Sequence, residues 1–415
     1  MGVCRVSVLF RRHSRTGTTI ARLCFLVFFL VVPRTQAMGQ SYTGSVLYPL
    51  TAPPGITSVN ASNNTVTYGS IASVDQMVGW GAVTSTTEHA LLWSAAGVVD
   101  LNPTNLPGFS TSSLAFGNSG SQQVGYGYGT AGADALLWNG TADSAVDLNP
   151  ASVLEGVSSS RAFGTDGIQQ VGSGVFQSSP RQSSPIIHAF LWTGTAASVV
   201  DLDPTSLSGI QESEAYAING SQQVGRGWEE GEPEFPTHAL LWSATAASAV
   251  DLNPTDLTGI TSSSALGTDG TQQVGYGDTV TGYTHSLLWN GTAASAVDLN
   301  PTDLSGITYS VALSTNGIQQ VGWGFASSLS NDEALLWTGT ADSAVDLQAL
   351  LPSTGTWTDS VATTIDSSGN VYGTADGTYN NVTGTFAVEW SVPEPGTGSL
   401  LLFGSAGILV RRRRK

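Results

Sequence analysis

Cysteine and lysine are almost absent from this 415-residue chain. The two cysteines, Cys4 and Cys24, lie near the amino terminus, and the single lysine is the last residue, Lys415. The stretch from Met38 to Pro395, here called the body, therefore has no disulfide and no thiol or amine nucleophile. The motifs G-x-S-x-G, H-E-x-x-H and the phosphate-binding glycine loop are missing as well. Carboxylate or metal-assisted chemistry is the enzymatic route that remains open.

Positive charge is scarce in the body. Its basic residues are Arg161, Arg181 and Arg226, against 31 aspartates and glutamates, so its formal charge is 3 minus 31, or −28. Such a surface repels nucleic acid and anionic lipid, and we expect neither as a partner. It suits cations, basic proteins or neutral polymers. A second interpretation is that the acidity only keeps the protein soluble.

Long apolar runs are absent, and a short one marks the amino terminus. Five arginines precede the apolar run Leu23 to Val32, and Thr35-Gln36-Ala37 follows as a small-residue cleavage site. Ten apolar residues are too few to span a membrane, but the order is typical of a secretory signal peptide. We expect residues 1–37 to be removed and the mature chain to begin at Met38.

A phrase close to A-L-L-W recurs seven times in the body. Its tryptophans are separated by 45, 54, 50, 47, 48 and 53 residues, a period typical of four-stranded propeller blades. They are Trp93, Trp138, Trp192, Trp242, Trp289, Trp337 and Trp390. The repeat predicts an all-β fold.

One copy, from Val250 to Trp289, indicates how a blade is built. Asp269-Gly270 is suited to a tight hairpin turn, and no apolar spacing of 3.6 residues predicts a helix. The extended segments are Ala249 to Leu252, Ile260 to Leu266, Gln272 to Tyr276 and Ser286 to Trp289. A lone sheet of this kind leaves an apolar face in water, so the copies must stack, with the tryptophans between them. Glycines that allow close approach recur at Gly79, Gly125, Gly172, Gly225, Gly275 and Gly322.

The two ends of the repeat array complement each other. Val46 to Leu50 matches the outer-strand phrase V-D-L-N-P but precedes the first A-L-L-W, whereas Ser360 to Trp390 provides only three strands. The amino-terminal strand should therefore complete the last blade. We predict a seven-bladed β-propeller of four-stranded antiparallel blades over residues 38–391.

The repeat phrase also resembles a known family. Gly167 to Gly172 reads G-I-Q-Q-V-G and His188 to Trp192 reads H-A-F-L-W, which is similar to the HAF family of extracellular repeats. The resemblance covers about Val46 to Trp390. It implies an exported or surface-associated bacterial protein with a propeller-like fold, and it implies no particular activity.

The carboxyl terminus, residues 392–415, resembles a PEP-CTERM sorting signal. The motif Val392, Pro393, Glu394, Pro395 is followed by an apolar segment and by Arg411 to Lys415. The resemblance implies recognition by an exosortase of a Gram-negative bacterium that makes exopolysaccharide, cleavage near the motif, and release to the cell surface or extracellular matrix. The apolar segment, Gly398 to Val410, is short for a transmembrane helix, so we expect the precursor to be anchored transiently in the inner membrane.

Positions that vary inside a constant repeat are candidates for binding. One is the x of V-G-x-G, occupied by Trp80, Tyr126, Ser173, Arg226, Tyr276, Trp323 and Thr374. Its four aromatic residues would stack on sugar rings if they are exposed at one end of the ring, and otherwise they pack between blades. We take Trp80, Tyr126, Arg226, Tyr276 and Trp323 as ligand-binding candidates.

Acidic residues and histidines recur at other repeat positions. His89, His188, His238 and His285 occupy one position, where other copies have Asp134, Glu333 and Phe386. We expect these histidines to make structural hydrogen bonds, because residues of separate blades do not converge on zinc. The aspartates of V-D-L are expected to cap turns or to link strands. Glu229, Glu230, Glu232 and Glu234 are candidate Ca²⁺ ligands, the alternative being a solvated acidic loop.

These observations favour a non-enzymatic protein of the cell surface or extracellular matrix. It would bind polysaccharide or another surface component, would have no catalytic residues, and would need no cofactor other than, at most, Ca²⁺. One alternative is a polysaccharide hydrolase or lyase that uses carboxylates at the central opening of the propeller. Another is a structural spacer with no ligand.

Overall fold

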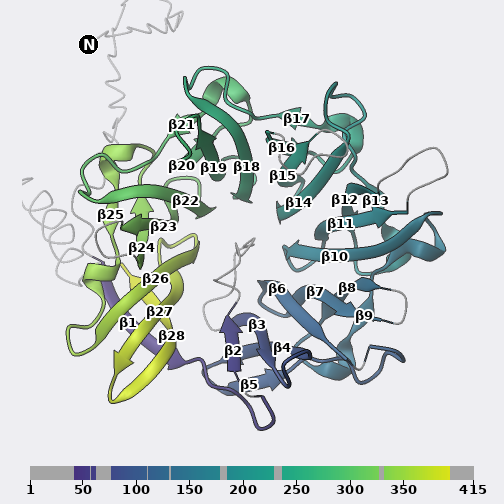
Figure 1. Cartoon of the computed structure of the whole chain (residues 1–415), viewed down its shortest axis with the longest axis horizontal. Coiled ribbons are helices and arrows are strands. Elements are labelled where there is room, and N and C mark those ends of the chain that lie inside the picture. Colours follow the sequence, from purple (N-terminus) through teal and green to yellow (C-terminus); the bar gives the residue numbers. More distant parts are fainter. Residues whose placement is uncertain are drawn as a thin grey trace, which may run out of the picture. The chain divides into compact units, whose positions relative to one another are not determined.

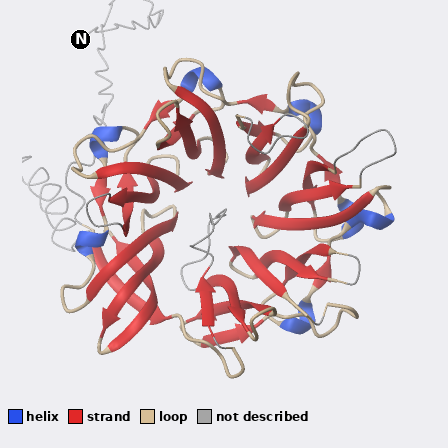
Figure 2. Cartoon of the chain, viewed as in Figure 1, coloured by secondary structure: helices blue, strands red, loops and turns tan. Residues whose placement is uncertain are grey.

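The computed structural model describes residues 42–56, 58–61, 76–109, 111–129, 132–177, 185–228, 236–326 and 331–392. These residues form seven four-stranded antiparallel sheets arranged in a ring, a seven-bladed β-propeller (Figure 1). Strands and short 3-10 helices are the regular elements of the described part (Figure 2). The predicted fold class is confirmed.

We number the blades I to VII and give their strands from the centre of the ring outward. Blade I consists of β2 (Ser58–Ala61), β3 (Gln76–Ala82), β4 (Glu88–Ser94) and β5 (Gly97–Asp100). Blade II consists of β6 (Ser113–Ser119), β7 (Gln122–Tyr128), β8 (Ala133–Trp138) and β9 (Val146–Asp147). Blade III consists of β10 (Val157–Thr165), β11 (Gln170–Phe176), β12 (Ile186–Trp192) and β13 (Val200–Asp201). Blade IV consists of β14 (Glu212–Asn219), β15 (Gln222–Trp228), β16 (His238–Trp242) and β17 (Val250–Asp251).

The remaining blades follow the same order. Blade V consists of β18 (Ile260–Thr268), β19 (Gln273–Thr279), β20 (Thr284–Trp289) and β21 (Val297–Asp298). Blade VI consists of β22 (Ile307–Thr315), β23 (Gln320–Ala326), β24 (Asn331–Trp337) and β25 (Val345–Asp346). Blade VII consists of β26 (Thr356–Ile365), β27 (Val371–Tyr379), β28 (Val382–Ser391) and β1 (Thr43–Pro49). The 3-10 helices are η1 (Ala142–Ser144), η2 (Pro150–Ser152), η3 (Ala196–Ser198), η4 (Ala246–Ser248), η5 (Ala293–Ser295), η6 (Ala341–Ser343) and η7 (Gln348–Leu350).

The repeat of the sequence is offset from the blade by one strand. The copy from Val250 to Trp289 begins with β17, which pairs with β16 of blade IV through Leu240↔Asp251 and Leu241↔Val250. The other three segments of that copy are β18 to β20 of blade V. Only η4 and a few flanking residues separate β16 from β17, so the chain can turn back onto β16 at once.

The last blade is closed by the amino-terminal strand, as the sequence predicts. β1 pairs antiparallel with β28, beginning with Thr43↔Ser391, so strands from the two ends of the propeller complete one sheet. Tyr42 adds a contact at this edge, because its hydroxyl donates to the carbonyl of Gly369 at 3.1 Å and accepts from the Gln319 side chain at 2.8 Å. The ring is thus closed by hydrogen bonds without a covalent link.

The recurring tryptophans are the largest fully buried side chains of the structure. Trp289, for example, is buried with Leu241 and Leu252 of blade IV and Ala265 and Leu287 of blade V. Equivalent clusters lie between other neighbouring blades. Each tryptophan therefore removes apolar surface of two blades from water, which is the main source of inter-blade stability.

A recurring serine and the Q-Q pair also link the blades, although the sequence alone does not identify them as contacts. The Ser263 hydroxyl of blade V accepts the backbone N–H of Ala239 in blade IV at 3.0 Å and donates to the Asn253 side chain at 2.7 Å. The Gln273 amide donates to the side-chain oxygen of Gln222 in blade IV at 3.0 Å, while its own oxygen accepts the backbone N–H of Gly291 at 2.7 Å. The second glutamine of the Q-Q pair thus contacts the first glutamine of the previous blade. It also holds the turn that follows the A-L-L-W strand of its own blade.

The recurring glycine of V-G-x-G is required by a close approach of the two inner strands. A Cβ atom on Gly275 would lie 2.0 Å from the carbonyl oxygen of Ser264, far inside van der Waals contact. The same overlap, at 1.9 Å, would occur at Gly125, Gly172, Gly225 and Gly322. The expected close approach is confirmed at these five positions. It brings together two neighbouring strands of one blade, not two blades.

Gly275→Ala should therefore lower the free energy of unfolding by about 3 kcal/mol, because backbone must move to admit the methyl group. Equilibrium denaturation of the purified protein measures this loss. Thr258→Ala, at an exposed loop position of the preceding connection, is the matched control and should leave stability within about 0.5 kcal/mol. Equal stability of the two variants would contradict the close approach.

Candidate functional site

A β-bulge recurs in the innermost strand of blades II to VII. In β6, Ala115 pairs with Gly125 and Gly117 pairs with Val124, which leaves Phe116 as the extra residue. The equivalent extra residues are Phe163, Tyr216, Leu266, Leu313 and Thr363. A bulge redirects the side chain of its extra residue. The apolar ones among these side chains, from blades II to VI, meet in one cluster.

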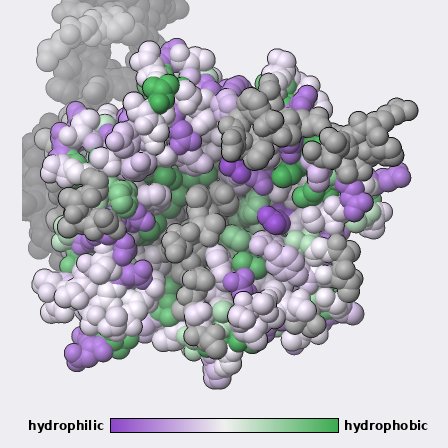
Figure 3. Space-filling view, in the orientation of Figure 1, coloured by the Kyte–Doolittle hydropathy of each residue, from purple (hydrophilic) through white to green (hydrophobic). Residues whose placement is uncertain are grey.

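We call this group the central aromatic cluster. Its rings are linked from blade I to blade IV: Phe116 lies 5.6 Å from Trp80 and 6.0 Å from Phe163, and Phe163 lies 5.7 Å from Tyr216. Leu266, Leu313 and Val361 extend it through blades V, VI and VII. The cluster therefore draws side chains from all seven blades. Figure 3 shows hydrophobic residues around the middle of the ring on the face in view.

All four aromatic candidates of V-G-x-G belong to this cluster or pack against it. Trp80 and Tyr126 are members and retain only 8% and 9% of their surface exposed. Tyr276 and Trp323 pack against the cluster and are partly exposed. The variable position thus contributes both packing and accessible ring surface, with the accessible rings on blades V and VI.

Tyr126 is stacked on Phe116, with ring centroids 5.6 Å apart and an interplanar angle of 17°. Burial, and then the neighbouring Tyr128, raise the pKa of Tyr126 to about 12. Its phenol therefore stays neutral over the physiological pH range.

Arg226 is held within blade IV. Its guanidinium donates to Glu214 Oε2 from Nη2 at 3.0 Å and from Nε at 3.3 Å, and it lies 5.2 Å from the Trp228 ring. The Tyr216 hydroxyl donates to the same Glu214 oxygen at 2.6 Å. This candidate is therefore engaged by an acidic and two aromatic neighbours, since its guanidinium also lies over Tyr216 at 5.6 Å.

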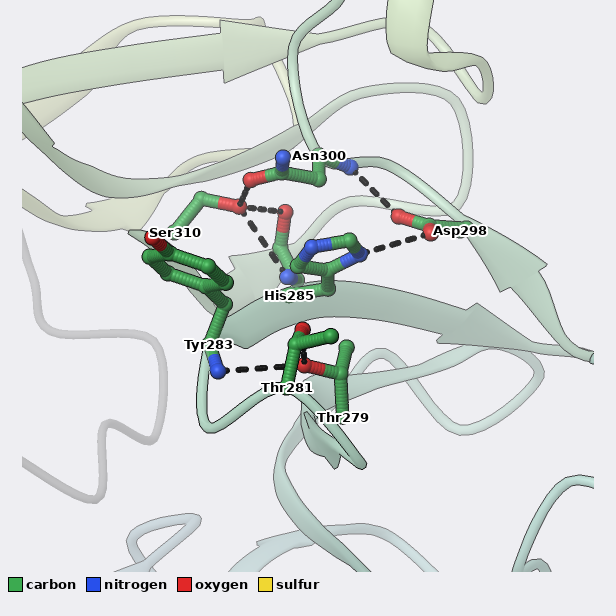
Figure 4. A network of polar contacts seen from close by, with 8 residues as sticks. Thr279, Thr281, Tyr283, His285, Asp298, Asn300 and Ser310 are labelled. Atoms are coloured by element: carbon green, nitrogen blue, oxygen red, sulfur yellow. Dashed lines mark hydrogen bonds and ion pairs between the residues drawn. The ribbon is translucent and has the colours of Figure 1, made fainter. Parts of the chain in front are cut away.

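The four histidines make the structural hydrogen bonds expected of them. In each case Nδ1 lies 2.7 to 2.9 Å from Oδ2 of the V-D-L aspartate of the same blade. Figure 4 shows His285 directed at Asp298, whose other oxygen accepts the backbone N–H of Asn300 at 2.8 Å. Asn300 in turn accepts from Ser310 of blade VI, so the pair is part of the inter-blade network. The V-D-L aspartates thus both cap the following turn and link strands.

Blade II has a carboxylate in place of the histidine. Burial, and then the charge of Asp147, raise the pKa of Asp134 from its ordinary value near 3.8 to about 6, against the lowering effect of a hydrogen bond from the Asn149 side chain. Burial also raises the pKa of Asp147. This pair lies on the two outer strands, β8 and β9, whereas the hydrolase or lyase alternative places its carboxylates at the central opening.

The remaining candidates fall mainly outside the described residues. Glu229, Glu230, Glu232 and Glu234 lie there, and so do Pro393, Glu394, Pro395 and the apolar segment beyond them. Within the described ranges, no group of three or more histidine, cysteine, aspartate or glutamate side chains is arranged to hold a metal ion. Val392 is described, and its N–H donates to the Asn370 side chain at 3.3 Å. No helix in the described part of the chain is long and apolar enough to cross a membrane.

Residues 391–415 match the family model described as the PEP-CTERM protein-sorting motif. The chain ends in this sorting motif. The motif indicates a protein that is exported in Gram-negative bacteria and sorted by an exosortase.

Other comparisons add little beyond this. A search of curated proteins finds no match to the sequence. Among solved structures, a Mycobacterium tuberculosis puromycin-hydrolyzing peptidase is 13% identical with a TM-score of 0.47, over 83% of this chain and 58% of that one. The polysaccharide lyase Uly1 is 8% identical with a TM-score of 0.43, over 87% and 95% of the two chains. A Trypanosoma rangeli sialidase is 13% identical with a TM-score of 0.37, over 87% and 60%.

The chain thus spans less than two thirds of the length of the peptidase and of the sialidase. Scores and identities this low assign neither a substrate nor an activity to it.

The raised pKa of Asp134 gives stability a defined pH dependence. Since the folded-state pKa lies above the unfolded value, the native state loses stability as pH rises from about 4 through about 6, and the loss persists above that range. Asp134→Asn should therefore match the wild type near pH 4 and exceed it by about 2 kcal/mol at pH 7. Denaturation across this pH range measures the difference.

Asp303→Asn, on an exposed loop of blade VI, is the charge-matched control. A constant difference between Asp134→Asn and wild type from pH 4 to pH 7 would show that the pKa of Asp134 is the same in the folded and unfolded chain, against this account.

Proposed function

We propose that the protein is a non-enzymatic component of the cell surface or extracellular matrix that binds polysaccharide at the central aromatic cluster. The observation that carries this proposal is the meeting of the variable V-G-x-G aromatics, from separate blades, in one cluster at the centre of the ring. Aromatic rings stack on the apolar faces of sugars, and Tyr276 and Trp323 keep ring surface for this contact. The charge of the body favours a largely neutral polymer.

The two ends of the chain support export and sorting. We infer that residues 1–37 act as a signal peptide, and that the blades are HAF repeats of an extracellular protein. The precursor is then held briefly in the inner membrane by Gly398 to Val410 until an exosortase cleaves near the sorting motif.

A second candidate is a carboxylate-dependent polysaccharide hydrolase or lyase. The observation that favours it is the adjacent pair Asp134 and Asp147, both with raised pKa, since one protonated and one ionised carboxyl group is what such chemistry needs. Against it, Asn149 donates to Asp134 and to Asp147 within the blade, which gives both carboxylates structural partners.

Binding is tested with residues 38–392, which contain every described blade, on a glycan array with and without Ca²⁺. A variant with alanine at Trp80, Tyr126, Tyr276 and Trp323 should lose binding, and the double variant Tyr276→Ala/Trp323→Ala should bind at least tenfold more weakly while folding normally. Tyr283→Ala, an exposed tyrosine outside the cluster, is the control and should bind normally. Absence of binding to every glycan would favour the structural spacer. Release of reducing ends or unsaturated products would favour the hydrolase or lyase if Asp147→Asn abolishes it.

Sorting is tested in a host that has an exosortase. Deletion of residues 393–415 should leave export intact and abolish proteolytic shortening and surface retention, which fractionation and intact-mass measurement detect. Replacement of the tail by an unrelated sequence of equal length is the control. Normal surface retention of the truncated protein would contradict a sorting role for the tail.

A further inference from the structure

Two of the three arginines of the body lie on neighbouring blades next to the centre of the ring. Arg161 is on β10, the innermost strand of blade III, and Arg226 is on β15 of blade IV (Figure 1). The strands β10 and β14 lie side by side, since a Cβ atom on Gly164 would come within 2.5 Å of the carbonyl oxygen of Tyr216. The scarce positive charge of the body is therefore concentrated at the central aromatic cluster.

The two arginines differ in their partners. Arg226 is paired with Glu214, as described above. Arg161 is exposed, and no aspartate or glutamate of the described residues lies within 4.0 Å of its guanidinium. The body has 31 acidic side chains and three basic ones, so a shortage of carboxylates does not explain why Arg161 has no such partner among the described residues.

Arg161 is nevertheless positioned. Its guanidinium carbon lies 5.0 Å from the centre of the Tyr126 ring, a cation–π contact, and Tyr126 is itself stacked on Phe116. The backbone of Arg161 is constrained as well. Its carbonyl oxygen packs so closely against Gly172 that a side chain at position 172 would not fit. The guanidinium of an exposed arginine is thus held against an aromatic ring, and no salt bridge to a described carboxylate occupies it.

A guanidinium group with free donors binds carboxylates and other planar anions in a bidentate manner. The strongly negative body repels a polymer that is charged at every residue. The anion that fits is therefore a single carboxylate on an otherwise neutral chain. We propose that Arg161 binds the carboxylate of an acidic sugar in a mostly neutral saccharide, whose rings pack on the central aromatic cluster. This inference rests on the proposed saccharide binding and adds the class of ligand.

The test is calorimetric titration of residues 38–392 with two probes. One probe is an oligosaccharide of neutral hexoses with one glucuronic acid residue, and the other is the same oligosaccharide after reduction of the carboxyl group to an alcohol. Wild-type protein should bind the acidic probe at least tenfold more tightly. Arg161→Gln should lose this preference and keep the affinity for the reduced probe, and Arg161→Lys should retain part of the preference because the charge remains without the fork.

Arg181→Gln removes the same charge at a residue outside the described ranges and is the matched control, expected to behave as wild type. Thermal unfolding of each variant identifies any loss of folding. Equal binding of both probes by the wild type, or an unchanged preference in folded Arg161→Gln, would overturn the role of Arg161 and leave the proposed function standing. Binding of neither probe would overturn both proposals.

Discussion

Each blade has two apolar faces, and the structure depends on covering both of them. A β-sheet with one neighbour would leave the other face in water, at a cost of about 25 cal/mol for each square ångström of apolar surface. A ring removes this cost for every blade, and the β1–β28 pairing completes it. The tryptophans and the serine and glutamine links all lie at contacts that this ring creates.

The repeat separates residues that hold the ring from residues that are free to differ. The histidine position illustrates this, since a His–Asp contact, an Asp–Asp pair and a Glu–Asp pair occupy the same place in different blades. The same backbone position thus accepts an imidazole or a carboxyl group, and in blade II the Asn149 side chain donates to Asp134. At the V-G-x-G position the variation is of another kind, because its four aromatic side chains reach the central aromatic cluster, to which all blades contribute. A ligand at the centre would encounter the differences between blades rather than their common features.

Much of this architecture can be predicted from the sequence. The spacing of the tryptophans predicts seven blades, and the unmatched V-L-Y-P phrase near Val46 predicts the strand that closes them, because both depend on local strand patterns that recur. The offset between repeat and blade follows from the same prediction, because a V-D-L-type strand that completes the last blade pairs with the A-L-L-W-type strand before it, as Val250 does with Leu241.

The central site could be predicted only in part. The variable aromatics are visible in the sequence because they interrupt a constant phrase. The bulges are not, because a bulge is a property of two paired strands, and they are what redirect Phe116 and its equivalents toward the cluster. Arg161 falls outside every repeated phrase, and its contact with Tyr126 emerges only from the positions of side chains distant in the sequence.

The pairing of Thr43 with Ser391 has a mechanical consequence. The two residues lie at the same end of an antiparallel pair, so a force that pulls the amino-terminal and carboxyl-terminal ends of the propeller apart loads the hydrogen bonds between β1 and β28 one after another. Bonds loaded in sequence yield at much lower force than bonds loaded together. Tension between the two ends would therefore peel β28 from β1 and open blade VII, while blades I to VI, each built from consecutive strands, would carry the load only afterwards. The β1–β28 pairing is therefore the part of the ring that yields first when its two ends are pulled apart.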